Sequence, residues 1–142
     1  MKRISLLIVL CILLSCSKKP QPINYGIDMC NFCQMTIVTK THAAQMVTDK
    51  GKQFKFDAIE CMIRFLDDKQ NLIPKSNLLI TNYSTPGTMT NAITASYVIC
   101  EEITSPMGAN LTGFASEQNA KEMINSPSAK LYNWNTIFNK LN

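Results

Sequence analysis

Two strand-to-helix junctions, about 59 residues apart, constrain the fold of this chain more than any other feature. At the first, the alternating pattern QFKF ends at Phe56, and Asp57 opens the run DAIECMIRFLDD, whose apolar residues recur at helical spacing. At the second, NLTGFA leads into Ser116 and the polar run EQNAKEMINS. Alternation predicts strands, and a period of three to four residues predicts helices. The chain is therefore expected to contain two similar units of small antiparallel strands, each closed by a helix.

Local signals place the remaining elements around these junctions. Asp57, with Glu60 three residues later, predicts a capping box at the start of a helix over about 58–67, and Ser116 predicts the second cap. A short strand plus helix is expected over 131–141, with Trp134 and Phe138 packed inside. Strands are expected at 35–39, 42–48, 52–56, 77–83, 92–100 and 110–115. The fold class is α+β, in units that follow a β-β-β-helix or a ββαβ order.

The first sixteen residues have the form of a bacterial lipoprotein signal. Lys2 and Arg3 precede an apolar run over 4–14 that is too short to span a bilayer, and LLSC resembles a lipobox. The expected organisation is a signal peptide over 1–15, a diacylated Cys16 that begins a tether over 16–27, and a domain over 28–142. Within the domain, the units are expected at about 28–75 and 76–142. This domain would face the periplasm or the outside, and the choice of inner or outer membrane stays open.

Charge and motif content exclude several classes of function. The net charge of +4 comes without a basic stripe or interleaved aromatic residues, which argues against a nucleic-acid partner. No Ser/His/Asp set, phosphate-binding loop or carboxylate pair can be defended, so the chain is not expected to be an enzyme. Attention turns to sulfur, because the signal peptide removes Cys11 and the lipid takes Cys16. The four remaining cysteines are Cys30, Cys33, Cys61 and Cys100.

The segment DMCNFCQM, residues 28–35, admits several kinds of site. Structural zinc would need a second ligand pair, which the chain lacks. A thiol-disulfide protein using Cys30 and Cys33 remains the alternative, although a strand rather than a helix is expected after Cys33. Cu(I) favours thiolate and thioether sulfur, and an extended strand would point Cys33 and Met35 to the same side. Cys61 is expected to be a buried core thiol, with a Cys61–Cys100 disulfide left open.

Two other side chains are candidates for such a site. Met107 lies in SPMGAN, where Pro106 and Gly108 impose an irregular backbone, so it is not a periodic core position. His42 is the only imidazole in the chain and is a less favoured ligand.

The segments CNFCQMTI, HAAQMVTDKGKQFKFDAIECMIRFL, TNYST and ITASYVIC, followed by SPMGANLTGFAS, resemble the NosL family of lipoproteins accessory to nitrous oxide reductase. The resemblance implies a Cu(I) chaperone of two ββα-type units related to the organomercurial lyase fold. It would deliver copper for the copper-sulfur centre of nitrous oxide reductase, working with a membrane ABC-type assembly complex. Carried over, Cys33, Met35 and Met107 match the family's ligands, and Cys30 is secondary. Gln34 stands where many members look like Cys-Gly-Met, so a firmer strand is expected there.

Overall fold

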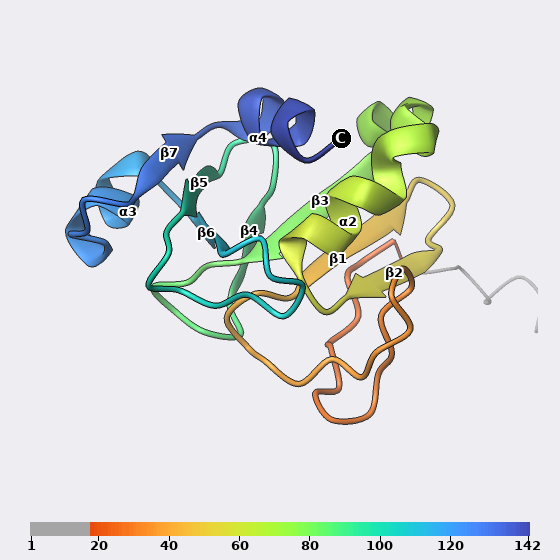
Figure 1. Cartoon of the computed structure of the whole chain (residues 1–142). Helices are drawn as coiled ribbons and strands as arrows, with labels where there is room; N and C mark the ends of the chain where they lie inside the picture. Colours follow the sequence, from red (N-terminus) through yellow and green to blue (C-terminus); the bar gives the residue numbers. More distant parts are fainter. Residues whose placement is uncertain (1–17) are drawn as a thin grey trace, which may run out of the picture.

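Two antiparallel sheets follow one another along the chain in the computed structural model, which describes residues 18–142 (Figure 1). The first sheet has the order β2-β1-β3-β4, and the second has the order β6-β5-β7. The strands of the first sheet are β1 (Ala44–Thr48), β2 (Gln53–Phe56), β3 (Ser76–Thr81) and β4 (Met89–Asn91). Those of the second are β5 (Ser96–Ile99), β6 (Leu111–Phe114) and β7 (Lys130–Tyr132).

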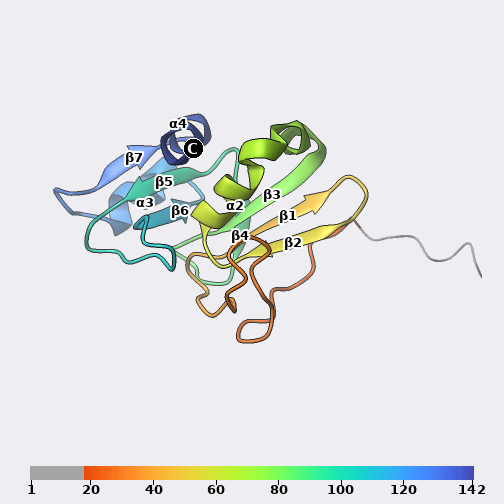
Figure 2. The same ribbon diagram turned by 45° about the vertical axis from the view of Figure 1, so that its right-hand side comes forward.

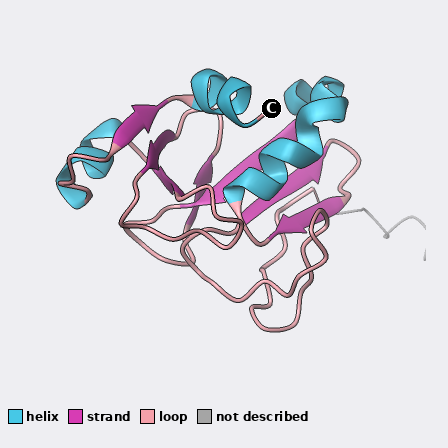
Figure 3. Cartoon of the chain, in the orientation of Figure 1, coloured by secondary structure: helices cyan, strands magenta, loops and turns pink. Residues whose placement is uncertain are grey.

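The helices complete two units with the same connectivity. α2 (Ile59–Leu66) and a 3₁₀-helical segment, η1 (Asp67–Lys75), connect β2 to β3, and α3 (Glu117–Met123) connects β6 to β7. α4 (Trp134–Leu141) ends the chain. Each unit is therefore strand-strand-helix-strand with its first strand in the middle of the sheet, which confirms the α+β expectation and selects the ββαβ order. Figure 3 shows the helices along the upper side and the long loops below.

The boundary between the sheets differs from the expected one. β3 pairs with β1 from Ala44–Ile80 to Thr48–Ser76, so residues 76–91 complete the first sheet. The two sheets are therefore separated between β4 and β5 rather than at residue 75. The strand expected over 92–100 is shorter for a local reason, because the Asn91 side chain accepts hydrogen bonds from the amides of Ile93 and Thr94 and forms a turn.

One of the two predicted helix caps is confirmed and the other is wrong. Ser116 caps α3 as expected, with its hydroxyl accepting from the Asn119 amide at 3.2 Å. The short strand and helix over 131–141 are also confirmed, and Trp134 and Phe138 are buried. The capping box at Asp57 is wrong, because α2 begins one residue later than that box requires and Ala58 occupies the cap without a side-chain hydrogen bond.

The segment expected to be a tether is docked on the first sheet over most of its length. The Gln53 side chain donates to the Lys19 carbonyl at 3.1 Å, the buried Gln45 side chain donates to the Gln21 carbonyl at 2.9 Å, and Ile23 enters the core. The central strand β1 is consequently buried on both faces, with α2 on one side and this segment on the other. The lipobox and Cys16 lie outside the described residues.

Helix α2 lies at the centre of the molecule (Figure 2). It contacts β1, β6 and α4, so a single core joins both units. Gly113 of β6 lies close to both β3 and α2, because a Cβ there would overlap Ile80 Cδ1 and lie 3.1 Å from Ile59 Cδ1. No helix within residues 18–142 is both long and apolar enough to span a bilayer.

Candidate metal centre

The cysteine-bearing loop, residues 28–37, is held against the end of β2. The Asn31 amide donates to the Lys55 carbonyl at 2.8 Å, and the Lys55 amide donates back to the Asn31 side chain at 2.7 Å. Lys55 also forms an ion pair with Asp28 at 2.6 Å. Because β2 runs directly into α2, these contacts bring the loop to the start of that helix.

Inside this loop, the backbone turns back on itself. The Cys30 amide donates to the Met35 carbonyl at 2.8 Å, and the Gln34 amide donates to the Cys30 carbonyl at 3.1 Å. Gln34 has φ of 64°, in the left-handed region that glycine adopts at little cost. The strand expected over 35–39 is therefore wrong, since Met29 and Thr36 form only an isolated bridge. The extended geometry expected to align Cys33 with Met35 does not exist.

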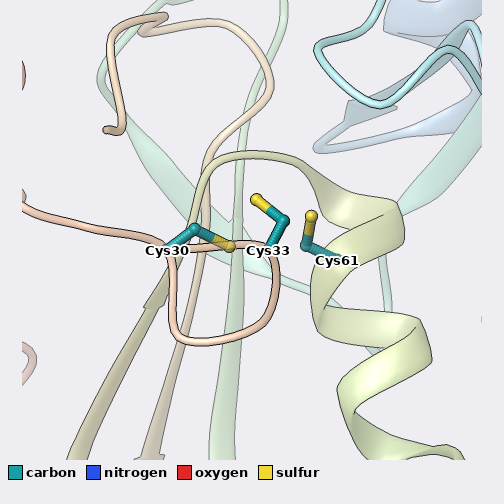
Figure 4. A group of neighbouring side chains, drawn as sticks. All are labelled: Cys30, Cys33 and Cys61. Atoms are coloured by element: carbon teal, nitrogen blue, oxygen red, sulfur yellow. The ribbon is translucent and has the colours of Figure 1, made fainter. Parts of the chain in front are cut away.

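Three thiols meet where the loop contacts the helix. The sulfurs of Cys30, Cys33 and Cys61 all lie within 4.8 Å of one another, two from the loop and one from α2 (Figure 4). Cys30 and Cys61 are fully buried, and Cys33 is half-buried. A trigonal metal with bonds of about 2.3 Å needs sulfurs about 4 Å apart, which is close to this arrangement. The centre can take a thiophilic ion with little movement, and Cys33 is its side open to solvent.

Hydrogen bonds give the three thiols different acidities. The Cys61 thiol donates to Cys30 and lowers the pKa of Cys30, and the amides of Asp57, Cys33 and Phe32 add to this effect against the cost of burial. The same hydrogen bond raises the pKa of Cys61, and burial raises the pKa of Cys33. Cys30 is therefore the most acidic thiol of the group. The N–H and S–H donors around its sulfur favour the deprotonated form that binds a cation.

The fourth cysteine belongs elsewhere. Cys100 follows β5 in a separate core cluster, and its thiol donates to Glu102 at 2.9 Å. All four described cysteines are free thiols, so the Cys61–Cys100 disulfide that the sequence left open does not form in this structure.

Met35, Met107 and His42 lie in different surroundings. Met35 is 44% exposed on the loop, whereas Met107 is half-buried and packs on the core cluster that contains Cys30 and Cys61. His42 lies outside the three-thiol group. Its ring meets Tyr83 edge-on with centroids 5.9 Å apart, its Nδ1 bonds Thr41 at 2.8 Å, and burial lowers its pKa.

Cys61 is the member of the cluster that sequence reasoning assigned to the core. Its helical position matches a core thiol, and it is indeed buried. The sequence does place Cys61 five residues after Phe56, where β2 ends, and so near the start of the helix. This position indicates a ligand only once the cysteine-bearing loop is known to pair with β2.

Comparisons with known proteins identify the family and a similar fold. The family model NosL matches residues 24–141 of the chain. The fold is similar to the crystal structure of the copper chaperone NosL from Shewanella denitrificans, with a TM-score of 0.68 and 22% sequence identity, over 84% of this chain and 95% of that one. No curated protein matches the chain.

Proposed function

The chain belongs to the NosL family, and from this premise we propose that it is a Cu(I)-binding metallochaperone rather than an enzyme. The observation that carries the proposal is the three-thiol centre, which joins two loop cysteines to a helix cysteine within 4.8 Å. Three sulfur donors suit Cu(I), which accepts two or three soft ligands, whereas structural zinc almost always takes four. Copper is here the cargo.

The centre combines retention with exchange. Cys30 and Cys61 are buried and would hold the ion, while the half-buried Cys33 would face an acceptor and leave the ion first. We include Met35 and Met107 as thioether ligands, in agreement with the family resemblance, and they would replace thiols in turn so that two or three sulfurs hold the ion at a time. Thioethers carry no charge and add coordination without making release difficult. Copper would then pass to the acceptor by stepwise exchange of sulfur ligands.

We further propose that the chaperone is lipid-anchored at Cys16, faces away from the cytoplasm and supplies copper for the copper-sulfur centre of nitrous oxide reductase through an ABC-type assembly complex. The LLSC motif and the family resemblance support this assignment. The docking of the preceding segment limits the length of the anchor. Because this segment is attached to the first sheet from Lys19 onward, covalent geometry allows about 10 Å between Cys16 and the folded domain. The centre would thus be held near the membrane partner.

Competition for Cu(I) with a chelator under reducing conditions tests the metal site. Cys30→Ser, Cys33→Ser and Cys61→Ser should each lose more affinity than the roughly 10- to 100-fold typical of outer-shell changes. Cys100→Ser is the matched control, since it also removes a buried thiol, and it should bind copper like the wild type. Equal binding by the three cluster variants and the wild type would overturn the chaperone proposal.

Acylation has its own test. The full chain expressed in a bacterium should incorporate a labelled fatty acid and sediment with membranes, and Cys16→Ser should do neither. Membrane fractionation also tells inner from outer membrane. An unlabelled wild-type chain would remove the anchor from the proposal and leave the copper site unaffected.

The low pKa of Cys30 favours one other candidate, a thiol-disulfide protein using Cys30 and Cys33. Against it, Cys30 is fully buried and no helix begins directly after Cys33. We expect no turnover in a disulfide-reduction assay in which the copper-free protein meets a protein disulfide and a reductant. Turnover that disappears in Cys30→Ser would favour the redox function instead.

A further inference from the structure

A buried carboxyl group belongs to the residue that precedes Cys61 in the chain. Glu60 follows Ile59 at the start of α2 and precedes Cys61, and its side chain is fully buried. Its Oε1 accepts a hydrogen bond from the Ser105 hydroxyl at 2.5 Å, while its Oε2 has no hydrogen-bond partner among the described residues. A buried carboxylate with one such partner costs stability compared with an apolar residue of similar size. Residues that break packing rules in this way are common at functional sites.

The partner of Glu60 comes from the other unit. Ser105 is 2% exposed and lies in the loop between β5 and β6. Its carbonyl accepts from the Gly108 amide at 3.0 Å, which closes a four-residue turn with Pro106 and Met107 at the two central positions. Proline restricts its own φ and the hydrogen bond closes the turn, so its backbone is constrained, while Gly108 adopts the positive φ of 75° at its end. Fixing Ser105 therefore fixes the direction in which Met107 leaves the backbone.

The Met107 turn packs on the core that both units share. Met107 packs against the core cluster that contains Cys30 and Cys61. One turn of α2 thus supplies both the Cys61 thiol and the carboxylate that holds the Met107 turn, and the hydrogen bond crosses from the first unit to the second.

We propose that Glu60 is a positioning residue for copper, which acts by holding Ser105 so that the Met107 thioether of the second unit reaches the three thiols of the first. The inference rests on the proposed Cu(I) site. Glu60 itself contributes no ligand. Burial of this carboxyl group lowers the stability of the fold, and in return the two units share one coordination sphere.

A double-mutant cycle in Cu(I) affinity, measured on the full chain by chelator competition, tests this role. Met107→Leu keeps the packing volume and removes the sulfur, and we expect it to weaken binding. Ser105→Ala should weaken binding by about 10- to 100-fold in the wild-type background, the range seen for outer-shell partners. In the Met107→Leu background, Ser105→Ala should have almost no further effect. Equal effects of Ser105→Ala in both backgrounds, or none in either, would overturn the inference.

Two Glu60 variants separate positioning from fold stability. Glu60→Gln keeps an oxygen that accepts from Ser105, and it should retain Cu(I) affinity within about threefold of the wild type. Glu60→Leu removes the acceptor, so it should lose affinity as Ser105→Ala does, and cooperative thermal unfolding of this variant checks that the fold is retained. X-ray absorption of the copper complex should show one sulfur fewer in Glu60→Leu than in Glu60→Gln. A full sulfur count in Glu60→Leu would overturn the inference even if Ser105→Ala failed to fold.

The outcome distinguishes this inference from the function on which it rests. If the wild type fails to bind Cu(I), the chaperone proposal is wrong, and the positioning role that rests on it is wrong as well. If the wild type and the cysteine variants behave as expected but the cycle is additive, the positioning role alone is wrong.

Discussion

The two units share one topology but use their helices in different ways. α2 buries six of its eight residues because it lies between the first sheet, β6 and α4, whereas α3 buries only Ala120 of its seven. Only the first unit is preceded by a segment that docks on its sheet and folds back as the cysteine-bearing loop. A repeated ββαβ order therefore does not by itself make a site. The site forms where that added segment meets the start of a largely buried helix.

The largest expected difference between the units lies in helix packing. Ile63→Ala in α2 should lower the free energy of unfolding by about 2–5 kcal/mol, because it leaves a cavity in the shared core. Met123→Ala at the exposed end of α3 should change it by less than about 0.5 kcal/mol. Urea unfolding of both variants measures the contrast. Similar losses would mean that α3 is as deeply packed as α2.

Contact between the units can be tested at Gly113. Gly113→Ala should cost about 1–3 kcal/mol, because the new methyl group would overlap Ile80 Cδ1 in the packed core. Ile80→Val removes that atom, so the double variant should lose less than the sum of the two single variants in thermal or chemical unfolding. Strict additivity would contradict the close approach of β6 to β3.

A smaller gain is expected in the loop that distinguishes the first unit. Gln34 has a left-handed backbone, which destabilises the folded state by roughly 1–2 kcal/mol for most residues. Glycine avoids this strain, but its greater entropy in the unfolded state lowers stability by about 0.4–1 kcal/mol. Gln34→Gly should therefore stabilise the protein by up to about 1 kcal/mol in urea unfolding. Gln118→Gly, a change of the same kind inside α3, should destabilise it and serves as the control.

The smallest effect concerns the polar contacts of the second unit. Hydrogen bonds from the Cys100 thiol, and then from the Ser126 and Ser128 hydroxyls, lower the pKa of Glu102 from 4.5 to about 2. A lowered pKa stabilises the fold above pH 4.5, and this contribution is lost as the pH falls toward 2. The thermal midpoint of the wild type should fall more steeply over this range than that of Glu102→Gln. Because Glu102 is exposed, the difference should be small, and parallel slopes would contradict the role of these contacts.

Local signals predicted those parts of the fold that local interactions decide. Ser116 caps its helix because its hydroxyl lies three residues from the amide it accepts, and Trp134 and Phe138 are buried because helical spacing places them on one face. Asp57 satisfied the same kind of rule and still does not cap α2. Its amide donates to the Cys30 sulfur and its side chain is buried near the Val38 amide, so contacts distant along the chain replaced the local one.

The sequence by itself determined the class of fold, the family and the interest of the sulfur-rich segment 28–35, since these depend on composition, periodicity and motif order along the chain. Only the tertiary structure decided that Cys61 joins Cys30 and Cys33, and that Glu60 reaches Ser105 across 45 residues. Periodicity tells which side chains are buried but not which buried side chains meet. That choice depends on how the loop pairs with β2 and how the second unit packs on α2.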